Sequence, residues 1–172
     1  MENKQEVLER LIAADDEASS ISASDYNAKV VLVGGSVLII RDLIFRQTPD
    51  IDTINLSKEL INVFRKYDIN CDANAFCESI PYNYEDRLEP VDIPTKVIKY
   101  YTISLEDLVI MKLFSSRGKD YKDIISPKVL EKLDWKKLEK IVSDGETDNS
   151  FNTRAYSEFL SRFEKYKKDY KK

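Results

Sequence analysis

The feature that most constrains the fold is an apolar segment broken by two adjacent glycines. Residues 29–33 form a short, largely β-branched run, Gly34-Gly35 follows, and residues 36–45 continue with helix-like apolar spacing. The chain has only 4 glycines, so two side by side indicate a tight turn between a strand and a helix. Such a turn lets the backbone approach a phosphate group closely, and Ser36 adds a hydroxyl.

A pair of acids follows this serine, with 13 residues between the serine and the first acid, in Asp50-Ile51-Asp52. Because side chains alternate along a strand, both carboxylates are expected on one face and Ile51 on the other. Carboxylates at this spacing lie about 7 Å apart and repel unless a cation lies between them. Mg²⁺ binds carboxylate and phosphate oxygens, and two ions about 4 Å apart can activate a nucleophile and hold a leaving pyrophosphate. The alternative is a solvated edge strand whose acids face water.

Apolar spacing and turn residues predict the remaining elements. We expect helices over residues 2–14 and 56–67, strands over 69–79 and 95–103, and a polar connection over 15–27. Ser104 and Asp107 fit a capping box that opens a helix running to about residue 114. The chain after Lys119 reads as helical, with breaks near Pro127 and over residues 143–150. These elements predict a mixed sheet with helices packed against it.

Composition excludes several classes of chemistry. The chain of 172 residues has no histidine, which rules out Ser-His-Asp machinery, histidine bases and two-histidine metal sites. Its 2 cysteines indicate neither a zinc site nor a disulfide scaffold. With 27 basic and 31 acidic residues the net charge is −4, so a polyanion would have to bind a local patch. The charged amino terminus and the absence of a long apolar run predict a cytoplasmic protein without a membrane segment.

Together these motifs resemble the polymerase-β-type nucleotidyltransferase superfamily. Its signature is a hydrophobic strand, Gly-Gly/Ser, a helix, and Asp-hydrophobic-Asp, as in Gly34-Gly35-Ser36 and Asp50-Ile51-Asp52 here. The segment from Leu105 to Ile124, with Lys112, Arg117 and Asp120, is similar to a bacterial subgroup of small nucleotidyltransferase-like proteins. That subgroup resembles the toxins of abortive-infection and toxin-antitoxin systems. The likeness covers roughly residues 29–125.

The resemblance implies an α+β protein with the minimal nucleotidyltransferase fold and additional C-terminal helices. Residues 1–125 would form the nucleotidyltransferase-like domain with its N-terminal helix, and residues 126–172 a C-terminal helical extension. The phosphates of a nucleoside triphosphate would lie on Gly34, Gly35 and Ser36, near Arg46. Asp50 and Asp52 would hold two Mg²⁺ ions.

Superfamily enzymes usually add a third carboxylate from a neighbouring strand, which helps to bind the metal and can deprotonate the acceptor. Asp72 is the first candidate because it lies on the next expected strand, and Asp92 is the second. If neither side chain reaches the site, nucleotide binding could survive with transfer lost.

A second polar cluster follows the helix that Ser104 opens. Lys112 shares a helix face with Leu105 and Leu108, so its ammonium must reach solvent or meet an anion. That anion is either the triphosphate or an acid of the protein. For Arg117, Lys119, Asp120 and Asp123 a salt-bridge network and a phosphate contact are the alternatives, and the Tyr82–Arg87 loop either rims the cleft or is an exposed turn.

Two functions follow from the sequence. The first is Mg²⁺-dependent transfer of a nucleotidyl group from a nucleoside triphosphate to an RNA, protein or small-molecule acceptor, as a component of a toxin-antitoxin system with a cognate antitoxin or partner protein. The second is a catalytically degenerate nucleotide-binding or protein-binding module of such a pair. A third carboxylate close to Asp50 and Asp52 would distinguish the enzyme from the module.

Overall fold

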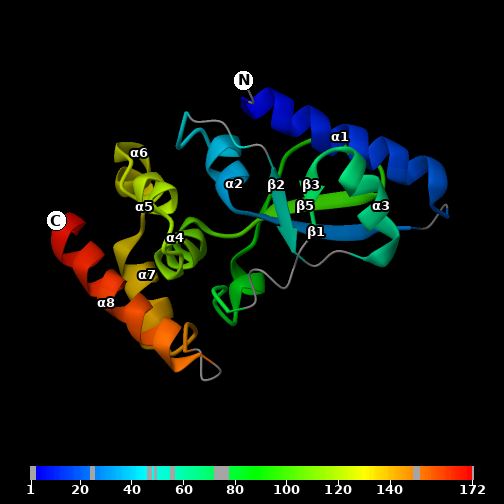
Figure 1. Cartoon of the computed structure of the whole chain (residues 1–172). Helices are drawn as coiled ribbons and strands as arrows, with labels where there is room; N and C mark the ends of the chain where they lie inside the picture. Colours follow the sequence, from blue (N-terminus) through cyan, green and yellow to red (C-terminus); the bar gives the residue numbers. More distant parts are fainter. Residues whose placement is uncertain are drawn as a thin grey trace. The chain divides into compact units, whose positions relative to one another are not determined.

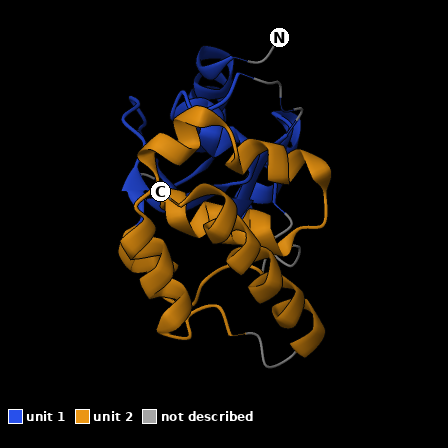
Figure 2. Cartoon of the chain, turned by 90° about the vertical axis from the view of Figure 1, so that its left-hand side faces the viewer, with its two compact units in different colours: residues 1–74, 88–103 blue, residues 75–87, 104–172 orange. Residues whose placement is uncertain are grey.

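The computed structural model describes residues 3–23, 26–45, 48, 50–54, 57–71, 78–148 and 152–171. The chain divides into two compact units, shown in Figure 2. Unit 1 comprises residues 1–74 and 88–103, and unit 2 comprises residues 75–87 and 104–172. Residues 104–125 group with the C-terminal helices in unit 2.

Unit 1 is built on a mixed five-stranded sheet with the order β3-β2-β1-β5-β4. Strand β1 pairs antiparallel with β2 and parallel with β5, while β3 pairs parallel with β2 and β4 antiparallel with β5. The strands are β1 (Ala28–Val33), β2 (Ile51–Ile54), β3 (Ile69–Asn70), β4 (Glu89–Pro90) and β5 (Ile98–Thr102).

Three helices belong to this unit: α1 (Lys4–Ile21), α2 (Gly35–Ile40) and α3 (Lys58–Lys66). Helices α1 and α3 lie on the same face of the sheet (Figure 1). On that face the Tyr100 hydroxyl donates to the Leu11 carbonyl at 3.0 Å, and the Tyr100 ring stacks on Phe64 with 6.3 Å between centroids. The mixed sheet and its helices confirm the predicted α+β class.

Helix α1 is longer than the sequence predicted, because it continues to Ile21 instead of ending near residue 14. Its Asp15 is fully buried and accepts backbone hydrogen bonds from residues 96, 97 and 98, at 2.6, 3.0 and 2.7 Å. These three N–H groups precede or begin β5, so the acid satisfies donors that the sheet leaves unpaired. An acid that looks like a helix end in the sequence thus joins the helix to the sheet.

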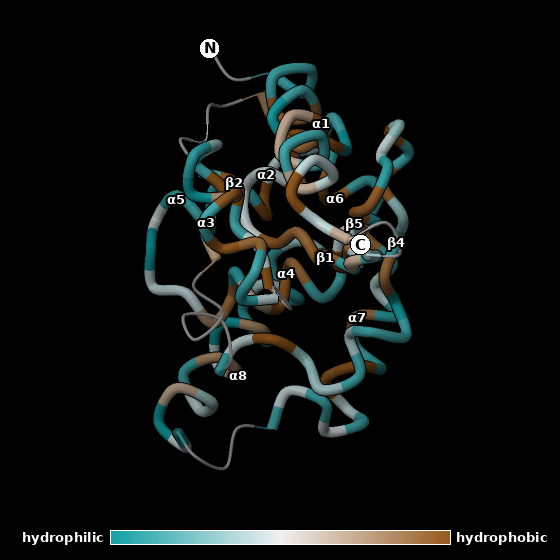
Figure 3. The backbone as a smooth tube through the Cα atoms, turned by 90° about the vertical axis from the view of Figure 1, so that its right-hand side faces the viewer, coloured by the Kyte–Doolittle hydropathy of each residue, from teal (hydrophilic) through white to brown (hydrophobic). Residues whose placement is uncertain are grey.

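Unit 2 is helical, and α4 (Leu105–Phe114) is its apolar centre. The hydropathy of the chain shows this directly, since α4 is among its most hydrophobic segments (Figure 3). Ser104 caps α4 as predicted, because its side chain accepts from the Asp107 backbone N–H at 3.1 Å. The other elements are η2 (Tyr84–Arg87), α5 (Gly118–Ile124), α6 (Pro127–Lys132), α7 (Trp135–Ser143) and α8 (Thr153–Tyr170).

Helix α8 packs its aromatic stripe on the rest of this unit. Phe159 stacks on Phe114 with 4.2 Å between ring centroids, and the Tyr166 hydroxyl donates to the Ile124 carbonyl at 2.7 Å. Arg162 donates to the carbonyls of Leu113 and Phe114 at 3.0 and 2.9 Å, which satisfies acceptors left open at the end of α4. No helix in the described part of the chain is long and apolar enough to cross a membrane.

Candidate functional site

The glycine turn has a backbone that only glycine adopts without strain. Gly34 has φ +72° and ψ −154°, a region essentially reserved for glycine. Gly35 begins α2 and is buried, as is Ser36, whose hydroxyl donates to the Val33 carbonyl at 3.1 Å. The predicted strand, glycine turn and helix are therefore confirmed, although α2 ends at Ile40 instead of near residue 45. Arg46 lies outside the described residues.

Asp52 lies directly against this turn. The antiparallel register pairs Val33 with Asp52, which brings the carboxylate beside the residue that follows Val33. A Cβ atom added to Gly34 would lie only 2.5 Å from Asp52 Oδ2. The glycine turn and Asp52, one of the two predicted metal ligands, therefore lie side by side, although a helix separates them in the sequence.

Asp50 occupies a different position from the one predicted. Strand β2 begins at Ile51, so Asp50 precedes it and is exposed. The Thr48 hydroxyl donates to the Asp50 carbonyl at 3.1 Å, which fixes the backbone there. The sequence predicted that both acids lie on one strand with alternating side chains. In the structure Asp52 lies within β2, and Asp50 lies one residue before it.

Asn70 is a site residue that the sequence analysis missed. It pairs with Asp52 across the parallel β2–β3 ladder, and its amide donates to Asp52 Oδ1 at 3.1 Å. Its position two residues before Asp72, where alternation puts it on the same face of an expected strand, was the signal available in the sequence. Asp72 itself lies outside the described residues, and Asp92 is exposed after β4.

The side chains at this turn supply only some of the ligands that a hard divalent cation needs. Carboxylate oxygens are the ligands that Mg²⁺ takes in proteins, and Asp52 can still coordinate while accepting from Asn70 because a carboxylate has about four lone-pair sites. Within the described residues, no group of three or more acidic or cysteine side chains could hold a metal. A Mg²⁺ ion at Asp52 would therefore take most of its ligands from a nucleotide and from water, as Mg²⁺ commonly does.

Lys112 lies in unit 2, where it forms the ion pair that was the alternative to a nucleotide contact. Its ammonium is 2.8 Å from both Asp120 Oδ1 and Asp123 Oδ2, and all three side chains are buried. Asp120 also accepts from Ser115 and Arg117, each at 2.6 Å. Of the two alternatives for this cluster, the salt-bridge network is the one observed for Arg117, Asp120 and Asp123. A contact between Lys112 and a triphosphate would require these carboxylates to share the ammonium.

This network gives unit 2 a defined pH dependence. Burial acts to raise the pKa of Asp120, but hydrogen bonds from Lys112, Ser115 and Arg117 and the charge of Lys112 outweigh it, so the pKa lies below its ordinary value. A lowered pKa stabilises the folded state above the ordinary pKa of about 4, and this contribution is lost as the pH falls through the lower, folded-state value.

We expect Asp120→Asn to be less stable than the wild type at pH 7, and the difference to shrink below about pH 4. Urea unfolding of both proteins between pH 7 and pH 3 measures this. Asp144→Asn is the control, because Asp144 is exposed and forms no ion pair with a described residue. A difference that grows on acidification would contradict the stabilising role of the Asp120 carboxylate.

The Tyr82–Arg87 loop is held within unit 2 by a second buried ion pair. Arg87 donates to both carboxylate oxygens of Asp107, at 2.8 to 3.1 Å, and its other guanidinium nitrogen is 2.8 Å from Glu146 Oε2. Asp107 is fully buried, while the Tyr82 side chain is 62% exposed. Arg87 therefore anchors the loop, whereas Tyr82, Asn83, Glu85 and Asp86 are exposed to solvent.

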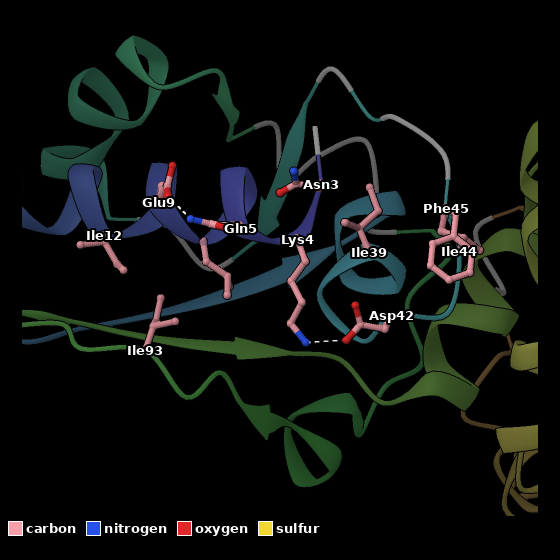
Figure 4. A pocket seen from close by; sticks show the side chains of 11 residues that line it. Asn3, Lys4, Gln5, Glu9, Ile12, Ile39, Asp42, Ile44, Phe45 and Ile93 are labelled. Carbon is pink, nitrogen blue, oxygen red and sulfur yellow. Dashed lines mark hydrogen bonds and ion pairs between the residues drawn. The ribbon is translucent and has the colours of Figure 1, made fainter. Parts of the chain in front are cut away.

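A cavity of about 670 Å³ in unit 1 is separate from the glycine turn. Its lining is mainly apolar and comes from α1, the end of α2 and the segment after it, and Ile93 (Figure 4). The Lys4–Asp42 ion pair, at 2.6 Å, closes one side. Of the predicted nucleotide and metal residues that the structure describes, none lines this cavity, so its position does not define the candidate site.

The comparisons with known proteins assign the chain to a family. Residues 9–171 match the model of a family described as "Nucleotidyltransferase of unknown function (DUF6036)". Because the match covers most of the chain, the protein belongs to this family. Comparison with curated proteins and with solved structures gave no match. The predicted likeness to nucleotidyltransferases is thereby confirmed, whereas the likeness to the toxin subgroup stays a prediction.

Proposed function

We propose that this protein is a Mg²⁺-dependent nucleotidyltransferase that moves a nucleotidyl group from a nucleoside triphosphate to an acceptor. The observation that carries the proposal is the contact between the glycine turn and Asp52, in a chain that belongs to a nucleotidyltransferase family. Gly34, Gly35 and Ser36 would receive the phosphates, and Asp50 and Asp52 would hold the metal.

The reaction assigns a distinct task to each part of the site. An acceptor hydroxyl oxygen attacks the α-phosphorus, the bond from that phosphorus to the oxygen bridging the β-phosphate breaks, and pyrophosphate leaves with the bonding electron pair. Bound Mg²⁺ would supply positive charge for the phosphate oxygens. The turn limits how far the triphosphate can move, and Asn70 orients the Asp52 carboxylate through the hydrogen bond at 3.1 Å. We assign the acceptor proton to Asp72, which follows Asn70 by two residues.

A specific observation supports the alternative of a catalytically degenerate binding module. The residue that pairs with Asp52 on the neighbouring strand is Asn70, which cannot accept the acceptor proton as a carboxylate can. The enzyme needs Asp72 or Asp92 to act as the base, whereas the module needs neither. In both cases the resemblance to toxin-antitoxin components suggests an RNA or protein partner.

Calorimetric titration of the purified protein with each nucleoside triphosphate, with and without Mg²⁺, tests the proposal. We expect one nucleotide to bind with Mg²⁺ present and at least tenfold more weakly in EDTA, because the carboxylate of Asp52 repels an uncompensated triphosphate. Release of pyrophosphate on adding an acceptor would then distinguish the enzyme from the degenerate module. Binding that is the same with and without Mg²⁺ would contradict the metal assignment.

A further inference from the structure

The sheet of unit 1 has two chemically different faces. Register places Val30 opposite Tyr100, on the face where Tyr100 contacts α1 and α3. Side chains alternate along β1, so Lys29, Val31 and Val33 lie on the opposite face, together with their cross-strand partners. The partner of Val33 is Asp52. The candidate site therefore belongs to the face that α1 and α3 do not cover.

The far end of this second face carries two lysines side by side. Lys29 pairs with Lys99 in the parallel β1–β5 ladder, and both side chains are exposed. Like charges at directly opposed positions destabilise a sheet. Neither ammonium forms an ion pair within the described part of the chain, so none of the carboxylates described there offsets this repulsion.

Tyr101 lies between the lysines and the site. Tyr101 pairs with Val31, which lies on β1 two residues from Lys29 and two from Val33. The Tyr101 side chain is half-buried. The Lys29 ammonium is 5.3 Å from the centre of its ring. Val31, Val33 and Ile103 are fully buried, so the exposed groups on this part of the face are Lys29, Lys99 and part of Tyr101. The lysine pair lies about 13 Å along the sheet from the level of Asp52, four residues at about 3.3 Å each.

We propose that the lysine pair and Tyr101 bind the acceptor, and that the acceptor is a single-stranded nucleic acid. Its reacting hydroxyl would lie at Asp52, a base would stack on Tyr101, and a backbone phosphate would lie between Lys29 and Lys99. Paired cations beside an aromatic ring form the usual combination for binding single strands, since phosphates meet the charges and bases meet the ring. This assignment rests on the proposed function and specifies the chemical class of its acceptor.

Charge favours a nucleic acid over a protein acceptor. The whole chain has a net charge of −4 and does not attract polyanions in general, so a nucleic acid needs a local cationic surface. The lysine pair provides one on the same face as Asp52. An acceptor protein would gain little from two unpaired lysines and one half-buried ring, because specific protein interfaces bury larger, mixed surfaces.

The experiment measures the fluorescence anisotropy of labelled 12-nucleotide RNA and DNA single strands with the full chain, at 50 to 200 mM salt without nucleotide. We expect Lys29→Gln/Lys99→Gln to bind at least about tenfold more weakly, and its log–log salt slope to be smaller by about 1.4, since each phosphate contact on a single strand contributes about 0.7. Tyr101→Leu should weaken binding by about tenfold, because it removes a stacking platform. The RNA and DNA arms decide which strand is preferred.

The matched control is Lys132→Gln/Lys140→Gln, which removes two exposed lysines that form no ion pair with a described residue. It should bind strands as the wild type does. The thermal midpoint of Lys29→Gln/Lys99→Gln should equal or exceed that of the wild type, because repulsion is relieved.

Strand binding that the Lys29/Lys99 variant retains, or that the control loses equally, would overturn the acceptor site. The acceptor site would also be overturned if the wild type bound a nucleoside triphosphate with Mg²⁺ but bound neither RNA nor DNA strands. That result would favour a protein acceptor. Calorimetry with nucleotide on the same samples separates the two proposals. Absence of Mg²⁺-dependent nucleotide binding in the wild type would overturn the proposed function, and the acceptor role with it.

Discussion

Replacing Asp52 with asparagine should lower Mg²⁺-dependent affinity for the nucleoside triphosphate by about a hundredfold or more, and transfer by about a thousandfold, while the protein stays folded. Loss of a metal ligand removes several kcal/mol of charge stabilisation, and ~4 kcal/mol corresponds to about a thousandfold in rate. The two side chains have the same shape, so Asn70 can still donate to the oxygen at position 52 and the contact with Gly34 persists. The variant therefore changes charge with little change in packing.

The measurement is a calorimetric titration with nucleotide in Mg²⁺ and in EDTA, beside thermal unfolding of the same samples. Asp144→Asn is again the matched control, because it neutralises an exposed acid at the end of α7 that forms no ion pair with a described residue. Its binding should equal that of the wild type. Full Mg²⁺-dependent binding by Asp52→Asn would remove Asp52 from the metal site.

The part of the site that could be predicted is the part determined by local sequence. Strand, glycine turn and helix follow from apolar spacing and from the rarity of glycine in this chain. The acidic pair after the helix then indicates phosphate and metal chemistry, and family membership agrees with that inference. Local patterns also predicted the start of α4 at Ser104.

What could not be predicted depends on residues far apart in the chain. Asp15 lies inside α1 because amides more than 80 residues away donate to it, and no local rule anticipates such partners. Strand β4 has only two residues, both exposed, and its pairing with β5 gives no periodic signal. Asn70 becomes part of the site only through its register with Asp52. The separation of Asp50 from β2 likewise depends on where pairing begins.

Register also changes which glycine matters most. The two glycines look equivalent in the sequence, but of the pair Gly34 is the one with a positive φ, and a Cβ added to it would meet Asp52. Gly34→Ala should lower the free energy of unfolding by about 4 kcal/mol. Of this, about 1–3 kcal/mol comes from forcing a side chain into a glycine-only conformation, and a similar amount from the overlap with the carboxylate. Urea unfolding at neutral pH measures the change.

A double-mutant cycle separates these two contributions. In the Gly34→Ala background, Asp52→Ala removes the carboxylate oxygen at 2.5 Å and leaves Asp52 Cβ as the contact at 3.4 Å. The free energy of unfolding of the double variant should therefore exceed the value expected from adding the two single effects by at least about 1 kcal/mol. The backbone strain at position 34 persists in the double variant. Gly118→Ala is the control, because nothing lies within 4 Å of its added Cβ and its φ is not positive. It should be neutral or slightly stabilising. If Gly34→Ala and Asp52→Ala proved simply additive, the turn and the carboxylate would not touch in solution, and the proposed nucleotide site would lose the contact that joins its two motifs.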